Sequence, residues 1–388
     1  MKKFISLLLV LTMLLPLSLT GCQNQNVKNM IKNYKKYDST GERYDCYLPD
    51  YMEIPDFTVF KVPNIKYTAT EEIINNYLTR DVIGYSGNDN DNYGKPAKKL
   101  DVAQINSTCW FEGEVFKGYT FTNKNGHAIV LGLNELDVPA IDENIIGMME
   151  GETKKFDFTF PDPYYRDLSK SGKTATIEVT LTILSPIKLI EADDSFYAQH
   201  FGYSTEHYKA VVKTRLEEQY NGYIETYKSD LVWDYLYENT VIKSYPKERD
   251  DMYNSLYEDY RSAALDANLT FLEYVKKKHN CDTIEDFNTY LNNYVDEYCK
   301  REMILYFVAR AYNLKYTNEY YEKEIMEYVK EFEIDNIEDA ESYIEFQVGL
   351  DEFKERIQLN YVYEWIGNNA PVAEDVTTYV NDLNKDLK

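Results

Sequence analysis

Glycine and proline are scarce in this chain, at 16 and 11 of 388 residues. Because both residues make turns and end helices, their scarcity favours long helices over a turn-rich sheet. Basic residues are also outnumbered: 42 Lys and Arg stand against 66 Asp and Glu, and the net charge is −24. This balance argues against a nucleic-acid-binding role, which needs a basic face, and against adsorption on an anionic membrane surface.

Familiar catalytic and metal-binding motifs are missing as well. The sequence has no P-loop, no G-x-G-x-x-G motif and no nucleophile elbow. Cys46, Cys109, Cys281 and Cys299 show no C-x-x-C spacing, so neither a zinc site nor any other metal or cofactor is expected. Cys281 and Cys299 could bridge two neighbouring helices in an oxidising compartment, or remain free buried thiols.

The N-terminus has the pattern of an export signal. Two lysines precede an apolar run from Phe4 to about Leu19, which is too short for a spanning helix but suits a signal peptide. The run ends in Leu-Thr-Gly-Cys at 19–22, which resembles the bacterial lipobox. We therefore expect residues 1–21 to be a lipoprotein signal peptide and Cys22 to be lipidated. An ordinary secretory peptide with a chance cysteine is the alternative.

Two segments follow the predicted lipidation site. Residues 22–54 are polar and tyrosine-rich, and they suggest a tether between Cys22 and the folded body. Residues 55–98 are predicted to form a linker of one short strand and one helix. Thr68 and Glu71 have the spacing of a capping box at the start of that helix.

Residues 99–188 have the pattern of a compact α+β domain. Apolar and polar residues alternate over 156–160 and again over 177–183, which indicates half-buried antiparallel strands. A short helix is predicted over 139–146 between them. Together these elements predict a mostly antiparallel sheet with one helix.

Residues 189–388 have apolar residues at helical spacing and predict an all-α domain. Thr283 and Thr317 are predicted N-caps of two of its helices. The segment 342–366 is predicted to be a last amphipathic helix.

The order of these segments, with several motifs, resembles trigger factor. Three stretches resemble the FKBP-type domain of that family: FEGEVF at 111–116, VPAIDENIIGM at 138–148 and FTFPDPY at 158–164. The stretch DDSF at 193–196 resembles the start of its helical arms. The resemblance covers roughly residues 55–388 and implies an FKBP-like antiparallel sheet with one helix, followed by a helical arm domain similar to those of trigger factor and SurA. The ribosome-docking signature is absent, so no ribosome partner is expected.

The resemblance also implies a substrate pocket in the FKBP-type domain. The positions carried over from the family are Ser107, Phe116, His127, Val138, Ile141, Tyr164 and Ile177. Prolyl isomerisation in this family needs a dry aromatic cup around the proline ring rather than a nucleophile or metal. Ser107, His127, Ile141 and Ile177 stand where the family has aromatic residues, which predicts a shallower, more polar cup. No catalytic residue is assigned.

The resulting expectation is an extracytoplasmic folding factor anchored to the bacterial cell membrane as a lipoprotein. Its partners would be unfolded or nascent exported polypeptides, with residual or no peptidyl-prolyl isomerase activity. One alternative is a fully active peptidyl-prolyl cis-trans isomerase with a rearranged pocket. Another is a surface adhesion or ligand-binding lipoprotein without chaperone activity. The 38 tyrosines suit an adaptable client-binding surface, or reflect a compositional habit of the organism's exported proteins.

Overall fold

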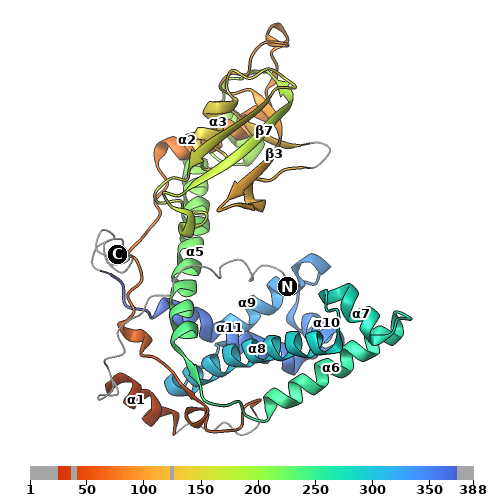
Figure 1. Cartoon of the computed structure of the whole chain (residues 1–388). Coiled ribbons are helices and arrows are strands. Elements are labelled where there is room, and N and C mark those ends of the chain that lie inside the picture. Colours follow the sequence, from red (N-terminus) through yellow and green to blue (C-terminus); the bar gives the residue numbers. More distant parts are fainter. Residues whose placement is uncertain (1–24, 36–41, 123–125, 374–388) are drawn as a thin grey trace, which may run out of the picture. The chain divides into compact units, whose positions relative to one another are not determined.

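Figure 1 shows the computed structural model of the chain, which describes residues 25–35, 42–122 and 126–373. The predicted signal peptide and Cys22 lie outside the described residues. The chain divides into two compact units. The sheet unit runs from Ile65 to Tyr227, and the helical unit combines the chain up to Asn64 with the chain from Lys228 onward. The predicted mixture of helix and antiparallel sheet is confirmed.

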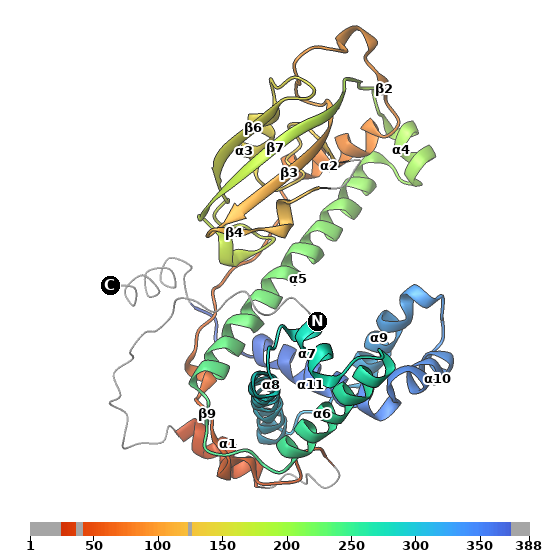
Figure 2. The same cartoon turned by 45° about the vertical axis from the view of Figure 1, so that its right-hand side comes forward.

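The sheet unit contains a five-stranded antiparallel sheet in its described residues, with strand order β4-β3-β7-β6 and with β5 also paired to β3 (Figure 2). The elements of the unit, in chain order, are α2 (Glu71–Ile83), β2 (Gly87–Asn88), β3 (Val102–Phe111), β4 (Glu114–Val115), β5 (His127–Val130), α3 (Pro139–Ile145), β6 (Thr153–Thr159), β7 (Thr174–Ser185), β8 (Ile187–Lys188), α4 (Asp194–Phe201) and the long helix α5 (Thr205–Asn239), which continues into the helical unit. Short 3-10 turns at Lys117–Tyr119 and Leu168–Lys170 connect some of them.

Alternation of apolar and polar residues determines which face of the sheet is buried. On β7, Ala175, Ile177, Val179 and Leu181 are buried, whereas the residues between them are partly or fully exposed. These side chains form the main core of the unit with α3 and the apolar residues of β3 and β5. The strands predicted over 156–160 and 177–183 are therefore confirmed. Ile183 is an exception to the predicted alternation: it is 45% exposed and Leu184 is buried instead, because the register between β3 and β7 shifts at Gln104 and Ile105.

A second core joins α2, α4 and the first half of α5. Ile74, Leu78 and Val82 of α2 are buried there, with Val212 and Leu216 of α5. The helix α2 begins two residues later than predicted, because Thr70 rather than Thr68 is its N-cap and accepts a hydrogen bond from the Ile73 amide.

The helical unit is mainly α-helical in its described residues. Its elements are α1 (Gln25–Tyr34), β1 (Met52–Glu53), the end of α5, β9 (Val241–Ile242), α6 (Glu248–Asp266), α7 (Phe271–His279), α8 (Ile284–Tyr312), α9 (Asn318–Val329), α10 (Ile337–Val348) and α11 (Leu350–Asn368). Thr283 forms the predicted N-cap of α8 in a full capping box with Asp286, and Thr317 caps α9. The single helix predicted over 342–366 is wrong: Gly349, with φ at 84°, separates α10 from α11.

The N-terminal segment of the helical unit, residues 25–35 and 42–62, is called the strap here. Where the sequence suggested a tether, Tyr44, Leu48 and Met52 are almost fully buried in the core formed with α8, α11 and the end of α5. Phe57, where the short linker strand was expected, is buried in the same core and begins a 3-10 turn, Phe57–Val59. Arg310 of α8 is 1% exposed and holds the strap through four hydrogen bonds. The strap is therefore an integral layer of the helical unit.

Helices α5 and α11 approach each other closely at Gly367. A Cβ placed there would lie 1.9 Å from Ser229 Oγ and 2.7 Å from Ser229 Cα, so only glycine fits. Gly222, earlier on α5, has nothing within 4 Å of the equivalent position.

Several tyrosines are hydrogen-bonded to carboxylates. Tyr208 donates to Asp81 at 2.7 Å, Tyr44 to Glu302 at 3.0 Å and Tyr321 to Glu341 at 2.5 Å. Because a phenol can satisfy a carboxylate while its ring packs against apolar neighbours, these pairs connect the two unusual features of the composition, many tyrosines and many acids.

The structure decides whether Cys281 and Cys299 form a disulfide. Cys281 lies three residues before Ile284, the first residue of α8, and Cys299 lies fifteen residues after Ile284 on that helix. At 1.5 Å rise per residue, their Cα atoms are separated by roughly 20 Å or more, whereas a disulfide needs less than about 7 Å. Both thiols are free and buried in the core of α6, α7 and α8.

Candidate functional site

The centre of the implied pocket is occupied by the protein's own aromatic side chains. We call the following set the aromatic cluster: Phe111, Phe116, Tyr119, Phe158, Phe160 and Tyr164. Phe160, directly after β6, is 1% exposed and lies in ring contact with all five others. Tyr119 stacks on it with ring centroids 6.1 Å apart. Each aromatic ring buries about 150–250 Å², so the cluster itself fills much of this region.

The hydroxyl of Tyr164 is engaged inside the cluster. Tyr119 donates to the Leu136 carbonyl at 2.5 Å, and the Tyr119 and Tyr164 hydroxyl oxygens lie 2.6 Å apart. Since the single proton of Tyr119 goes to Leu136, Tyr164 must donate to Tyr119. Burial raises the pKa of both phenols, so both protons stay in place at neutral pH. Tyr164 has no proton left for a substrate carbonyl in this arrangement.

The other six positions implied by the resemblance are divided between core, rim and cleft. Ile141, Ile177 and Val138 are buried core residues that pack in the same core as the cluster. Ser107 is buried and donates to the Tyr119 carbonyl at 2.7 Å, which fixes the turn that presents Tyr119. Phe116 is half-buried at the rim of the cluster.

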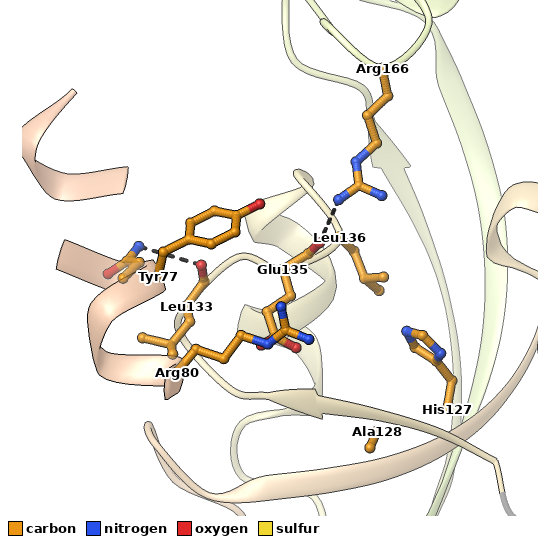
Figure 3. Close-up of a pocket in the computed structure, with 9 residues that line it drawn as sticks. Tyr77, Arg80, His127, Ala128, Leu133, Glu135, Leu136 and Arg166 are labelled. Carbon is orange, nitrogen blue, oxygen red and sulfur yellow. Dashed lines mark hydrogen bonds and ion pairs between the residues drawn. The ribbon is translucent and has the colours of Figure 1, made fainter. Parts of the chain in front are cut away.

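His127 lies apart from the aromatic cluster. Its ring stacks on Phe121 with centroids 4.1 Å apart, and its side chain lines a cleft between α2 and the sheet. Figure 3 shows this cleft, which has a volume of about 250 Å³. Its lining residues are Asn76, Tyr77, Arg80, His127, Ala128, Leu133, Glu135, Leu136 and Arg166.

Two arginines enter the cleft from opposite sides (Figure 3), and each is paired with an acid. Arg80 of α2 forms an ion pair with Glu135 at 2.8 Å. Arg166 pairs with Asp137 and donates to the Glu135 carbonyl at 2.7 Å. Burial raises the pKa of Glu135, and Arg80 opposes that shift. Burial lowers the pKa of His127, helped by the positive charges of Arg80 and Arg166, so its imidazole is neutral at pH 7.

Leu136 connects the cleft to the aromatic cluster. Its side chain lines the cleft, and its carbonyl accepts the hydrogen bond from Tyr119. The site is therefore a closed aromatic core beside a narrow, polar cleft.

Sequence reasoning missed three of the residues that shape this site. Tyr119 lies in an irregular turn, and its partner Tyr164 is 45 residues away, so no local pattern marks the pair. Phe160 was recognised as a strand residue but not as the centre of the cluster. Arg80 has no motif, although its place one turn after Tyr77 on an amphipathic helix puts both on one face.

In residues 25–35, 42–122 and 126–373, no group of three His, Cys, Asp or Glu is arranged to hold a metal ion. Within the same ranges, no helix combines the length and apolarity needed to cross a bilayer.

Comparisons with known proteins point to one kind of relative. No family model matches the chain. The trigger factor of Caldicellulosiruptor bescii is 23% identical over 85% of this chain and 73% of its own length, and that of Caldicellulosiruptor saccharolyticus is 22% identical over 86% and 74%. The trigger factor of Saccharophagus degradans is 35% identical over a shorter stretch, 32% of this chain and 28% of its own length.

A solved structure was also found, of a trigger factor chaperone studied for promiscuous substrate recognition in folding and assembly. It aligns over 82% of this chain and 72% of its own with a TM-score of 0.41 and 16% identity. The similarity to trigger factors therefore rests on the sequence relatives, which cover most of this chain, and not on this structural likeness. The chain is a trigger factor-like protein, and this homology supports a chaperone-like folding function.

Proposed function

We propose that this protein is a lipid-anchored, extracytoplasmic folding factor that binds unfolded segments of exported polypeptides and has little or no prolyl isomerase activity. The observation that carries the loss of isomerase activity is the hydroxyl chain from Tyr164 through Tyr119 to the Leu136 carbonyl. A proline ring could enter only if the aromatic cluster opened, and Tyr164 would then have to leave Tyr119. Lipidation at Cys22 and export rest on the N-terminal sequence alone.

Aromatic side chains on the helical unit support polypeptide binding. Tyr290, Tyr294 and Tyr298 of α8 are spaced four residues apart and are 37–42% exposed, so they form one stripe along the helix. Phe346 of α10 is 85% exposed. Rings with a polar tip can contact apolar segments of many sequences without themselves aggregating, which suits a client-binding surface.

The test measures isomerisation and aggregation on the same preparations. Exchange NMR on an Xaa-Pro peptide would compare the wild-type chain with Tyr119→Phe and Tyr164→Phe. We expect little catalysis by the wild type, and a gain for Tyr119→Phe, because that variant releases the Tyr164 hydroxyl. Efficient wild-type catalysis that Tyr164→Phe abolishes would overturn the proposed loss of isomerase activity and make the protein an enzyme.

Client binding is tested by suppression of aggregation of a reduced, unfolding protein. Replacing Tyr290, Tyr294 and Tyr298 together with serine should weaken suppression several-fold. Tyr85→Ser and Tyr93→Ser, at tyrosines of the sheet unit that are 48% and 49% exposed, serve as the matched control. If wild-type protein does not delay aggregation at equimolar client, the chaperone proposal is wrong.

A further inference from the structure

The negative charge of the chain is not evenly distributed. Residues 23–37 contain four lysines and no aspartate or glutamate. Three of these lysines, Lys28, Lys32 and Lys35, lie on or directly after α1 and are exposed. Their spacings of four and three residues place them on one face of the helix. We call this surface the lysine face of α1.

The opposite face of α1 is fixed to the helical unit. Met30 and Tyr34 are 3% and 5% exposed and belong to the same core as α8. The Tyr34 ring contacts Phe307 with centroids 5.3 Å apart, and its hydroxyl accepts a hydrogen bond from Arg310 at 2.7 Å. Because α1 is held this firmly, the lysine face is a fixed outer surface rather than a passing arrangement of a loose tail.

The lysines of this face are available for a ligand. Among the residues that the structure describes, none of the three forms an ion pair, and Lys35 lies only over the ring of Tyr47, at 5.8 Å. This row of positive charge lies in a stretch, residues 23–37, that has no acidic residue, in a chain of net charge −24. A partner that matches three positive charges along one helix face is extended and anionic.

We propose that the lysine face of α1 binds anionic lipid headgroups and holds the helical unit against the membrane surface. This proposal rests on the proposed lipidation of Cys22. Only Gln23 and Asn24 separate Cys22 from the first residue of α1, and three extended residues reach at most about 11 Å. A lipid on Cys22 would therefore bring the lysine face to the headgroups, and one lipid signal plus a basic patch is a stable combination.

The size of the effect follows from the number of lysines. A lysine near an anionic leaflet strengthens membrane binding about fivefold, so three contribute about a hundredfold. The acidic remainder of the protein reduces this gain, but at 0.1 M salt its repulsion is screened beyond about 10 Å. The proposed contact concerns one surface only, and for that surface it replaces the expectation against adsorption that the net charge alone had given.

The test uses the chain from residue 22 onward, which retains every described residue, in a lipidated form and as Cys22→Ser. Vesicles of phosphatidylcholine are compared with vesicles containing 30% phosphatidylglycerol, by co-sedimentation at 0.1 M and 0.5 M salt. The unlipidated protein should bind the anionic vesicles at least tenfold better than neutral ones at 0.1 M salt. This preference should disappear at 0.5 M salt and in the triple variant Lys28→Gln, Lys32→Gln, Lys35→Gln.

The matched control removes the same charge elsewhere on the helical unit, with Lys315→Gln, Lys323→Gln and Lys330→Gln at exposed positions. It should keep the preference for anionic vesicles. Equal binding of wild type and the α1 triple variant would overturn the proposal, as would equal binding to the two kinds of vesicle. Failure of the lipidated form to arise in cells would refute only the anchor, because the Cys22→Ser arm does not depend on it.

Discussion

Replacement of Arg310 by methionine should be among the most destabilising single changes in the helical unit. The guanidinium is 1% exposed and donates to the Tyr34 hydroxyl at 2.7 Å, the Glu42 carboxylate at 2.9 Å, and the carbonyls of Tyr44 and Cys46 at 2.5 and 3.2 Å. Methionine would fill most of the volume but would remove the donor of all four hydrogen bonds and the buried cation that pairs with Glu42.

The magnitude follows from the interactions that are lost. A hydrogen bond from a charged donor contributes about 1.5–3 kcal/mol, and breaking a buried charge pair costs about 3–5 kcal/mol in all. The carbonyls of Tyr44 and Cys46 and the Tyr34 hydroxyl keep a second donor, which limits the loss. Partial entry of water reduces this cost, and we expect the free energy of unfolding of the helical unit to fall by about 4 kcal/mol. For a unit of this size each kcal/mol lowers the melting temperature by about 2–4 °C, which gives a decrease of about 8–16 °C.

Differential scanning calorimetry checks this prediction, with Arg261→Met as the control. Arg261 is 57% exposed and pairs only with Glu258, so its loss should cost less than about 0.5 kcal/mol. The two units can unfold in separate thermal transitions, and only the melting temperature of the helical unit should decrease. If Arg310→Met shifts the transition no more than Arg261→Met, the strap is not held in the way described.

Three further predictions concern other sites. Gly367→Ala should destabilise the helical unit by about 1–3 kcal/mol in urea unfolding, because the added Cβ meets the backbone of α5, whereas Gly222→Ala, which meets nothing, should be neutral or stabilising. In an NMR titration His127 should show a pKa below the ordinary value of 6.5, and Arg80→Gln should raise this pKa. Because the unfolded chain then takes up the proton first, folding stability should fall as the pH drops below 6.5. Asp142→Ala removes a buried carboxylate that accepts from two loop amides at 2.8 and 3.0 Å, and should cost about 2–3 kcal/mol in the same unfolding assay; a loss under 0.5 kcal/mol would mean that the loop re-forms its bonds with water.

Local patterns were sufficient for the regular elements. Strand β7 was predictable because its alternating residues face a buried core on one side, and the start of α8 was predictable because Thr283 and Asp286 form a capping box within four residues. The break at Gly349 was missed because the apolar periodicity continues across it into α11. One glycine at positive φ is a weak signal against such a pattern.

The features that could not be predicted from the sequence depend on contacts between residues that are far apart in the chain. The strap is rich in Tyr, Asn and Lys and has the composition of a linker, yet its burial depends on Glu302 and Arg310, more than 250 residues away. The aromatic cluster likewise brings together segments that are distant in the sequence. The loss of family aromatics at Ser107 and Ile177 was visible in the sequence, but Tyr119 and Phe160 fill the region from segments whose meeting depends on the fold.

The strap has a consequence for the order in which the chain can fold as it is synthesised. The sheet unit is one continuous stretch that ends at Tyr227, so its contacts can form before the rest of the chain emerges. The helical unit needs both ends: Arg43 meets Glu302 and Tyr34 meets Arg310 across 259 and 276 residues. Closing such loops is slow, and meanwhile the apolar side chains of residues 44–57 have no core to enter. A folding factor built in this way would itself remain open at its N-terminal end until α8 has emerged.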